Sequence, residues 1–298
     1  MSTRVKRLSK EIILFNILAY SLVILFGIIC ILPIVMIVMG SFASDKSIIT
    51  YGYTLIPKEF SMKAYELIFK NPGDILRAYG MSIIITSVGC GLGLFMVSMT
   101  SYVLSKKEFK YRNMFAFFFY FTTLFSGGIV SSYILYSRYL LLKDSLLALI
   151  FPLILNVFYI IVMRSFIVSI PESIAESAKV DGAGEFTIFI KLILPLLKPA
   201  LASIGLFIAL DYWNDWYHAM LYINNSNHYP LQYLLYKMLN TIEALKSLSA
   251  ASGVPLPDMP QQSMKLAMTV IAVGPIIFLY PFVQKYFVQG ITLGAVKG

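Results

Sequence analysis

Charged residues are scarce in this sequence. Asp, Glu, Lys and Arg make up 13% of the 298 residues, whereas about 25% is typical of a soluble domain. Hydrophobic residues make up 58%, and the mean hydropathy is +0.78. This balance argues against a soluble enzyme or a soluble binding domain and favours a protein that is embedded in a membrane.

Cysteines and nucleotide-binding motifs are also scarce. Cys30 and Cys90 are the two cysteines, and both fall inside apolar runs. We therefore expect packing residues, with neither a disulfide nor a metal site. The chain has no Gly-x-x-x-x-Gly-Lys-Ser/Thr sequence, so it cannot supply an ATP site of that kind. Nucleic acid binding is not expected either, because the net charge of +9 is divided among short connections and forms no continuous basic patch.

Long runs without charge are abundant. A helix needs about 20 apolar residues to cross a bilayer. Five charge-free runs are close to or above that length: Ile12–Ser44, Ala78–Ser105, Asn113–Ser137, Ser145–Met163 and Leu266–Gln284. A sixth candidate, from about residue 196 to about residue 223, is interrupted by Asp211, Asp215 and His218. The sequence therefore predicts an all-α membrane protein with six transmembrane helices.

The distribution of Lys and Arg predicts the orientation. Basic residues are concentrated at the N-terminus and after the second apolar run: Arg4, Lys6, Arg7, Lys10, Lys106, Lys107, Lys110 and Arg112. The first and last connections are nearly balanced by acids. Six spans with these segments inside place both termini, and residues 172–185, in the cytoplasm.

The second apolar run contains several small residues. Gly89 and Gly93 are four residues apart, as are Ser87 and Gly91. A nucleotide-binding interpretation is poor because the glycines lie inside a predicted span. The spacing is typical of helices that pack closely in a membrane, so we expect another helix to lie against these positions.

The most informative segment lies between the fourth and fifth predicted spans. It reads Glu176-Ser177-Ala178-Lys179-Val180-Asp181-Gly182, followed after nine residues by Leu192-Ile193-Leu194-Pro195. It closely resembles the EAA loop in the membrane subunits of ABC importers. The spacing matches fully. Ser177 replaces an alanine and Leu192 an isoleucine, and each keeps the size or polarity class.

The resemblance implies that residues from about 171 to about 195 form two short helices that dock into a groove on an ATPase subunit. Small residues would let the partner approach closely, Gly182 would permit the bend, and acids would offer charge to the partner. The predicted coupling residues are Glu172, Ala175, Glu176, Ser177, Ala178, Asp181, Gly182 and Ala183. The alternative is an ordinary amphipathic helix at the membrane surface.

Further segments resemble carbohydrate-uptake permeases related to the maltose permease MalG, with an overall pattern closest to the YtcP/LplC branch. They are Trp213-Asn214-Asp215-Trp216, residues 280–287 and residues 290–298. The resemblance implies a type I ABC importer permease (MetI-like) fold in a multi-pass protein of the bacterial cytoplasmic membrane. Residues 1–73 would hold the N-terminal tail, the first span and an extracellular segment, and residues 74–298 the permease core.

The same resemblance implies partners rather than catalysis by this chain. These are a second homologous permease subunit, two ATPase subunits that use ATP and Mg, and an extracellular sugar-binding lipoprotein or periplasmic binding protein. The chain itself would bind no cofactor and would not be an enzyme. Membrane lipid would surround it.

The fifth predicted span carries a polar segment. Asp211, Asn214, Asp215 and His218 are spaced i, i+3, i+4 and i+7, so one continuous helix would place them on a single face. Ionisable residues in a span cost about 2.5–3.5 kcal/mol each and normally face a pathway or a partner. Acids and amides beside aromatic rings suit a saccharide. The predicted path residues are Asp211, Trp213, Asn214, Asp215, Trp216 and His218.

Alternative interpretations remain for this segment and for the whole chain. Trp213, Trp216 and Tyr217 could form an interfacial aromatic belt, or Asp215 and His218 a structural link to a neighbouring helix. An ABC permease for a non-sugar solute would share the loop. An ATP-independent secondary carrier would need inverted repeats and would leave the loop unexplained.

Overall fold

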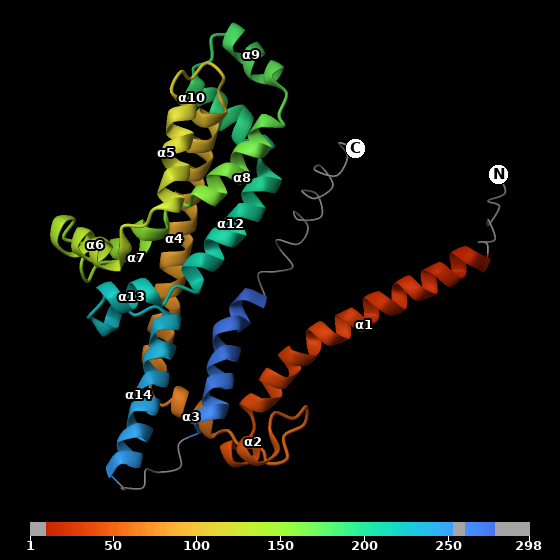
Figure 1. Ribbon diagram of the computed structural model, residues 1–298, viewed down its shortest axis with the longest axis vertical. Coiled ribbons are helices and arrows are strands. Elements are labelled where there is room, and N and C mark those ends of the chain that lie inside the picture. Colours follow the sequence, from red (N-terminus) through yellow and green to blue (C-terminus); the bar gives the residue numbers. More distant parts are fainter. Residues whose placement is uncertain (1–9, 253–259, 278–298) are drawn as a thin grey trace. The chain divides into compact units, whose positions relative to one another are not determined.

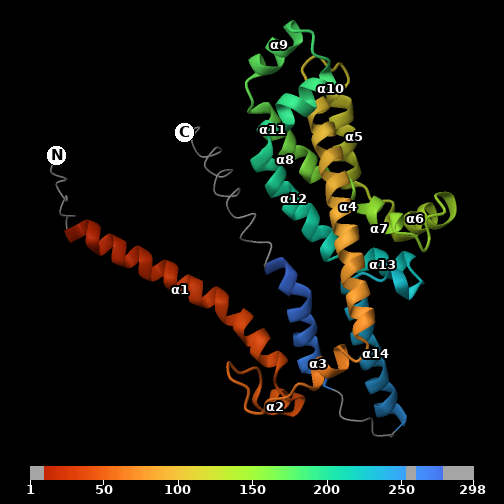
Figure 2. The same ribbon diagram turned by 180° about the vertical axis from the view of Figure 1, so that it is seen from behind.

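The protein is described here by a computed structural model that covers residues 10–252 and 260–277. The described residues fall into two compact units. One contains residues 10–70, 241–252 and 260–273, and the other contains residues 71–240 and 274–277. Figures 1 and 2 show the helices from opposite sides.

The first unit contains α1 (Lys10–Ser41), α2 (Asp45–Tyr51), α3 (Lys63–Ile68) and the helical residues 261–273. Asp45 joins two distant parts of the chain. Its carboxylate accepts hydrogen bonds from the backbone N–H groups of Gln261 (2.6 Å), Gln262 (2.9 Å) and Ser263 (2.9 Å). The first N–H groups of a helix have no partner within that helix, so Asp45 caps this one.

The second unit is organised around one long helix, α4 (Pro72–Ser105). It packs against α8 (Val157–Val168) and α12 (Lys198–Trp213), and both lie along it in Figure 2. The fully buried residues of its core include Val97, Met163 and Phe189.

Shorter elements complete the second unit. They are α5 (Arg112–Leu124), α6 (Gly128–Ile134), the π-helical turn Leu135–Tyr139, α7 (Leu147–Ile150), the 3₁₀ turn Phe151–Leu153, α9 (Glu172–Val180), α10 (Glu185–Ile188), the π-helical turn Phe189–Ile193, α11 (Leu194–Leu196), α13 (Tyr217–Tyr222) and the 3₁₀ turn Ser226–His228. The helix α14 (Leu231–Ser252) begins in this unit and continues into the other.

Close packing at two glycines of α4 is confirmed. A Cβ on Gly89 would lie within 2.4 Å of the Tyr212 ring of α12, and a Cβ on Gly93 would lie 3.1 Å from the carbonyl oxygen of Ile154. Gly91 has open space around it, and Ser87 is exposed. The prediction of a packed pair Ser87 and Gly91 is therefore wrong within this chain, because that face of α4 points away from α12.

Within residues 10–252 and 260–277, two helices are long and apolar enough to cross a membrane, Leu14–Ser41 and Pro72–Ser105. Three bent pairs raise the number of candidate spans among the described residues to as many as five. They bend by 114° between α5 and α6, by 54° between α7 and α8, and by 84° between α10–α11 and α12. The predicted sixth span is described as far as residue 277, so the count of six stays a prediction.

The bends have local causes. Gly128 has φ +80°, which favours glycine, and it follows the break after α5. The Asn156 side chain accepts a hydrogen bond of 2.9 Å from the Phe158 N–H and caps α8. Pro195 and Pro199 flank the break at Leu197. The basic residues Arg4, Lys6 and Arg7 and the motifs at 280–287 and 290–298 lie outside the described residues.

Candidate functional site

Residues 172–188 form two short helices joined by a bend. Pro171 precedes α9, and Gly182 follows it with φ +79°. The Ala183 N–H donates to the Ala178 carbonyl (2.9 Å) and the Gly182 N–H donates to the Lys179 carbonyl (3.0 Å). This pair of bonds is the Schellman ending of a helix, which favours glycine. The two helices and the bend therefore match the geometry that the sequence predicts.

The outer face of α9 is a mixture of acidic, hydroxyl and apolar side chains. Glu172, Glu176, Ser177 and Asp181 are exposed. The alanines behave differently. Ala175 is buried, and Ala178 and Ala183 pack against the core of the chain itself. The prediction that small residues offer a surface to a partner is therefore wrong for Ala175, because α9 packs this side chain into its own core. For the half-buried Ala178 and Ala183 it stays a prediction.

Two apolar residues on this segment escaped the sequence analysis. Val180 is 88% exposed and Phe186 is 65% exposed. Exposed apolar side chains next to acids are common at surfaces that bind another protein. The available signal is position: Val180 follows the exposed Ser177 by three residues, so the two lie on the same side of α9.

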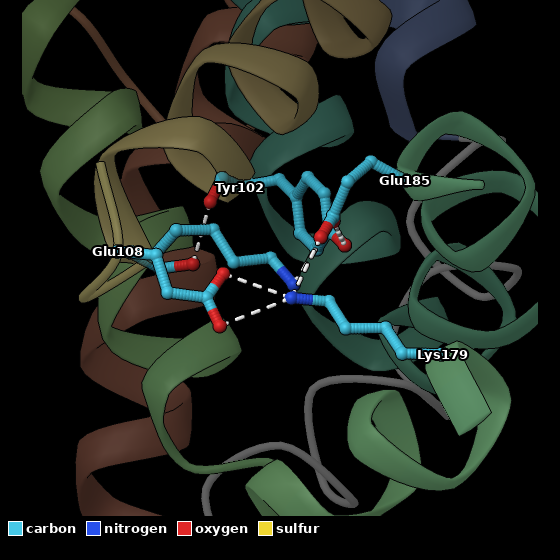
Figure 3. Close-up of polar contacts among 6 residues, drawn as sticks. Tyr102, Glu108, Lys179 and Glu185 are labelled. Atoms are coloured by element: carbon cyan, nitrogen blue, oxygen red, sulfur yellow. Dashed lines mark hydrogen bonds and ion pairs between the residues drawn. The ribbon is translucent and has the colours of Figure 1, made fainter. Parts of the chain in front are cut away.

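Charged side chains join this segment to the turn that follows α4. The Lys179 Nζ lies 2.8 Å from Glu108 and 2.9 Å from Glu185 (Figure 3). Glu185 also accepts a hydrogen bond of 2.7 Å from the Tyr102 hydroxyl. Lys106 lies 3.1 Å from Glu185, and Lys107 lies 2.7 Å from Glu172. A cleft of about 170 Å³ lies between this turn and α9.

Opposite charges stabilise one another in this cluster, which is formed by Lys106, Lys107, Glu108, Glu172, Lys179 and Glu185. Burial opposes ionisation of Glu185, but the hydrogen bonds from Tyr102, Lys179 and Lys106 outweigh it and lower the pKa of Glu185 to about 2. Hydrogen bonds to Glu108 and Glu185 raise the pKa of Lys179. The Lys107 hydrogen bond lowers the pKa of Glu172. Glu185, Lys179 and Glu172 are therefore charged at neutral pH.

The second candidate, residues 211–218, is not one helical face. α12 ends at Trp213 and α13 begins at Tyr217. Asp215 accounts for the break, because its carboxylate accepts a hydrogen bond of 3.2 Å from the His218 N–H. Such local bonds compete with a continuous helix. The prediction of a shared face for Asp211, Asn214, Asp215 and His218 is therefore wrong.

The polar groups of this segment contact different elements. Asp211 is exposed and accepts a hydrogen bond of 2.7 Å from the Tyr159 hydroxyl on α8. Asn214 accepts a hydrogen bond of 3.3 Å from the Gln232 side chain on α14. The Asp215 carboxylate lies 2.9 Å from the His218 ring nitrogen Nδ1. The segment thus links α12 to both α8 and α14.

The two tryptophans have different environments. Trp213 is 7% exposed, and its ring centre lies 6.3 Å from that of Tyr79 on α4. Trp216 is half-buried and stacks on Tyr236 of α14 with ring centres 4.2 Å apart. Trp213 is thus a packing residue in this conformation, while Trp216 keeps part of its surface accessible.

α12 connects the two candidates. Residues 172–188 lie near its start and α13 follows its end, so the two regions are at opposite ends of the helix (Figure 1). With a rise of about 1.5 Å per residue, the helix separates them by roughly 24 Å. A displacement of residues 172–188 can therefore reach α13 through the single helix α12.

Comparison with known proteins decides the family. No protein-family model matches the chain. It is 37% identical over 286 residues to the polygalacturonan/rhamnogalacturonan transport system permease protein YtcP of Bacillus subtilis, covering 96% of this chain and 99% of YtcP. It is 40% identical to protein LplC of the same organism over 274 residues, which is 91% of each. The chain belongs to the permease subunits of ABC sugar importers.

A solved structure agrees with this membership. It is the crystal structure of a bacterial ABC transporter involved in the import of the acidic polysaccharide alginate. The TM-score is 0.75 at 29% identity, covering 94% of this permease and 99% of the matched chain. The predicted fold class, an all-α permease of the ABC importer type, is confirmed.

Proposed function

We propose that this permease works as one of two homologous membrane subunits in an importer that moves a saccharide, in particular an oligosaccharide, across the bacterial cytoplasmic membrane. Two ATPase subunits would hydrolyse ATP with Mg, and an extracellular sugar-binding lipoprotein or periplasmic binding protein would deliver the solute. The permease itself binds no cofactor and catalyses no reaction in this proposal.

The observation that carries the proposal is the exposed side of residues 172–186. A helix, a glycine bend and a second helix present Glu176, Val180, Asp181 and Phe186 outward. An apolar pair flanked by acids suits a groove on a soluble partner. The ATPase would hold this face, and its closure on ATP would move α9. For the ATPase to reach this face, residues 172–186 and both termini must lie in the cytoplasm, as the basic residues of the connections predict.

The saccharide path is proposed for the other end of α12. Asp211 and Asn214 offer oxygen atoms that accept hydrogen bonds from sugar hydroxyls, and the rings of Trp216 and Tyr236 suit the flat face of a sugar ring. The names of similar proteins support the saccharide class: YtcP is named for polygalacturonan and rhamnogalacturonan, and the solved transporter for alginate.

Reconstitution tests the proposal. The permease, its partner permease, the ATPases and the binding protein are placed in liposomes, and uptake is measured with four labelled solutes: an oligogalacturonide, a neutral arabino-oligosaccharide, a peptide and an amino acid. We expect ATP-dependent uptake of a saccharide. Uptake of the peptide or the amino acid alone would show a non-sugar ABC permease. Uptake without the ATPases would show a secondary carrier.

A further inference from the structure

Three consecutive residues after α4 contact three separate points of the 172–185 segment. Lys107 contacts Glu172 at the start of α9, and Glu108 contacts Lys179 near the end of α9. Lys106 contacts Glu185 at the start of α10. The turn therefore holds both ends of α9 and the beginning of the next helix.

Buried contacts bring α10 against α4 at the same place. Tyr102, in the last turn of α4, is 6% exposed and donates its hydroxyl hydrogen to Glu185. Its ring centre lies 5.2 Å from that of Phe189, which directly follows α10 and also lies 6.3 Å from Phe95. α10 thus rests on α4 through packing, and α9 is joined to the end of α4 by charge.

The charged contacts to α9 are largely exposed. The side chains of Lys107 and Glu172 are 73% and 59% exposed, and that of Glu108 is 73% exposed. Exposed ion pairs contribute little to the stability of a fold. They can still fix the position of a short helix relative to its neighbour, since they act at both of its ends.

We propose that the turn formed by residues 106–108 passes the movement of α9 to α4, with Lys107 and Glu108 as positioning residues for transport. This proposal rests on the proposed function, in which an ATPase moves α9. α4 is the appropriate receiver because it packs along both α8 and α12. When α9 shifts, its two contacts with Lys107 and Glu108 pull the end of α4 with it, and the helices packed against α4 follow.

The test uses the complete reconstituted importer and the ion pair between Lys107 and Glu172. Lys107→Glu and Glu172→Lys are made singly and together, and saccharide uptake per ATP hydrolysed is measured in assembled complexes. Each single reversal places like charges together, so we expect the ratio to fall by about twofold or more. The double reversal restores the attraction and should return the ratio toward wild type.

Lys110→Glu is the matched control. Lys110 lies in the same connection between α4 and α5, but its Nζ lies over the Tyr111 ring, 6.0 Å from the ring centre. We expect this variant to keep the wild-type ratio. Glu108→Gln is a second variant, for use if a reversal prevents folding, because it removes one charge and keeps a hydrogen-bond acceptor. It should also lower the ratio.

Several results would overturn the proposal. An unchanged ratio in the single reversals, or a double reversal that is no better than either single variant, excludes a positioning role. Loss of ATPase binding with a normal ratio in the remaining complexes makes the turn a docking determinant instead. Gly182→Val is measured in parallel. If it uncouples transport while the Lys107 variants do not, this inference fails and the proposed function stands.

Discussion

The ring of Tyr212 fills the space beside Gly89 that any larger residue would need. Its hydroxyl then donates a hydrogen bond of 2.6 Å to the Ile150 carbonyl, so one side chain of α12 joins α4 to α7. A Cβ at position 89 would lie within 2.4 Å of this ring. The pair therefore fixes the distance between the two helices that connect the candidate sites.

Gly89→Ala should destabilise the permease because the Tyr212 ring must move and its hydrogen bond must weaken. Overpacking of this kind costs about 1–3 kcal/mol. Thermal unfolding of the purified protein in detergent measures the effect. Gly91→Ala is the matched control, since a Cβ there meets nothing within 4 Å. Equal unfolding temperatures for the two variants would contradict the close packing.

Trp216→Ala and Trp213→Ala should have different consequences. The accessible Trp216 ring is proposed to contact the saccharide, and an aromatic contact is worth about 0.5–1.5 kcal/mol. Uptake per assembled complex should therefore fall by about two- to tenfold in Trp216→Ala. Trp213 is buried, so Trp213→Ala should lower the amount of assembled complex. Unchanged normalised uptake in Trp216→Ala, Asp211→Ala and Asp215→Ala together would leave the segment as an interfacial belt.

The ionised carboxylate of Glu185 should stabilise the folded protein by the same amount at all pH values near neutrality. Its pKa falls from the ordinary 4.5 to about 2 in the folded protein. A lowered pKa gives stability that is present above pH 4.5 and is lost as the pH falls toward 2. The difference in unfolding temperature between wild type and Glu185→Gln should thus be constant from pH 6 to pH 8 and shrink below about pH 4.5. A difference that changes between pH 6 and pH 8 would show that Glu185 titrates there.

Local chemistry accounts for the parts of the fold that the sequence predicts well. Gly182 ends α9 because glycine readily adopts a positive φ. Pro195 and Pro199 flank the bend before α12 because proline fixes its own φ and has no N–H to donate. The same local reasoning failed at Asp215. Its carboxylate accepts a hydrogen bond from the His218 N–H in the first turn of α13, and the i, i+3, i+4 spacing could not reveal that competition.

Tertiary contacts explain the remaining differences. Ala175 lies in the core and Val180 outside it because α9 packs against α10 and the turn Phe189–Ile193. Nothing in the spacing of small residues distinguishes these two sides of a short helix. The cluster of Lys106, Lys107 and Glu108 with α9 likewise joins residues more than sixty positions apart, so the sequence alone shows the basic run after α4 only as a topology signal.

Replacement of Gly182 tests the central claim most directly, which is that residues 172–186 couple ATP hydrolysis to transport. A β-branched residue is strained at φ +79°, so Gly182→Val should reorient α10 relative to α9. Gly184→Ala is the control, because Gly184 has φ −70° and open space around it. In the reconstituted importer we expect Gly182→Val to lose saccharide uptake per ATP hydrolysed and Gly184→Ala to keep it. Wild-type ATPase assembly and wild-type uptake per ATP in Gly182→Val would contradict the account.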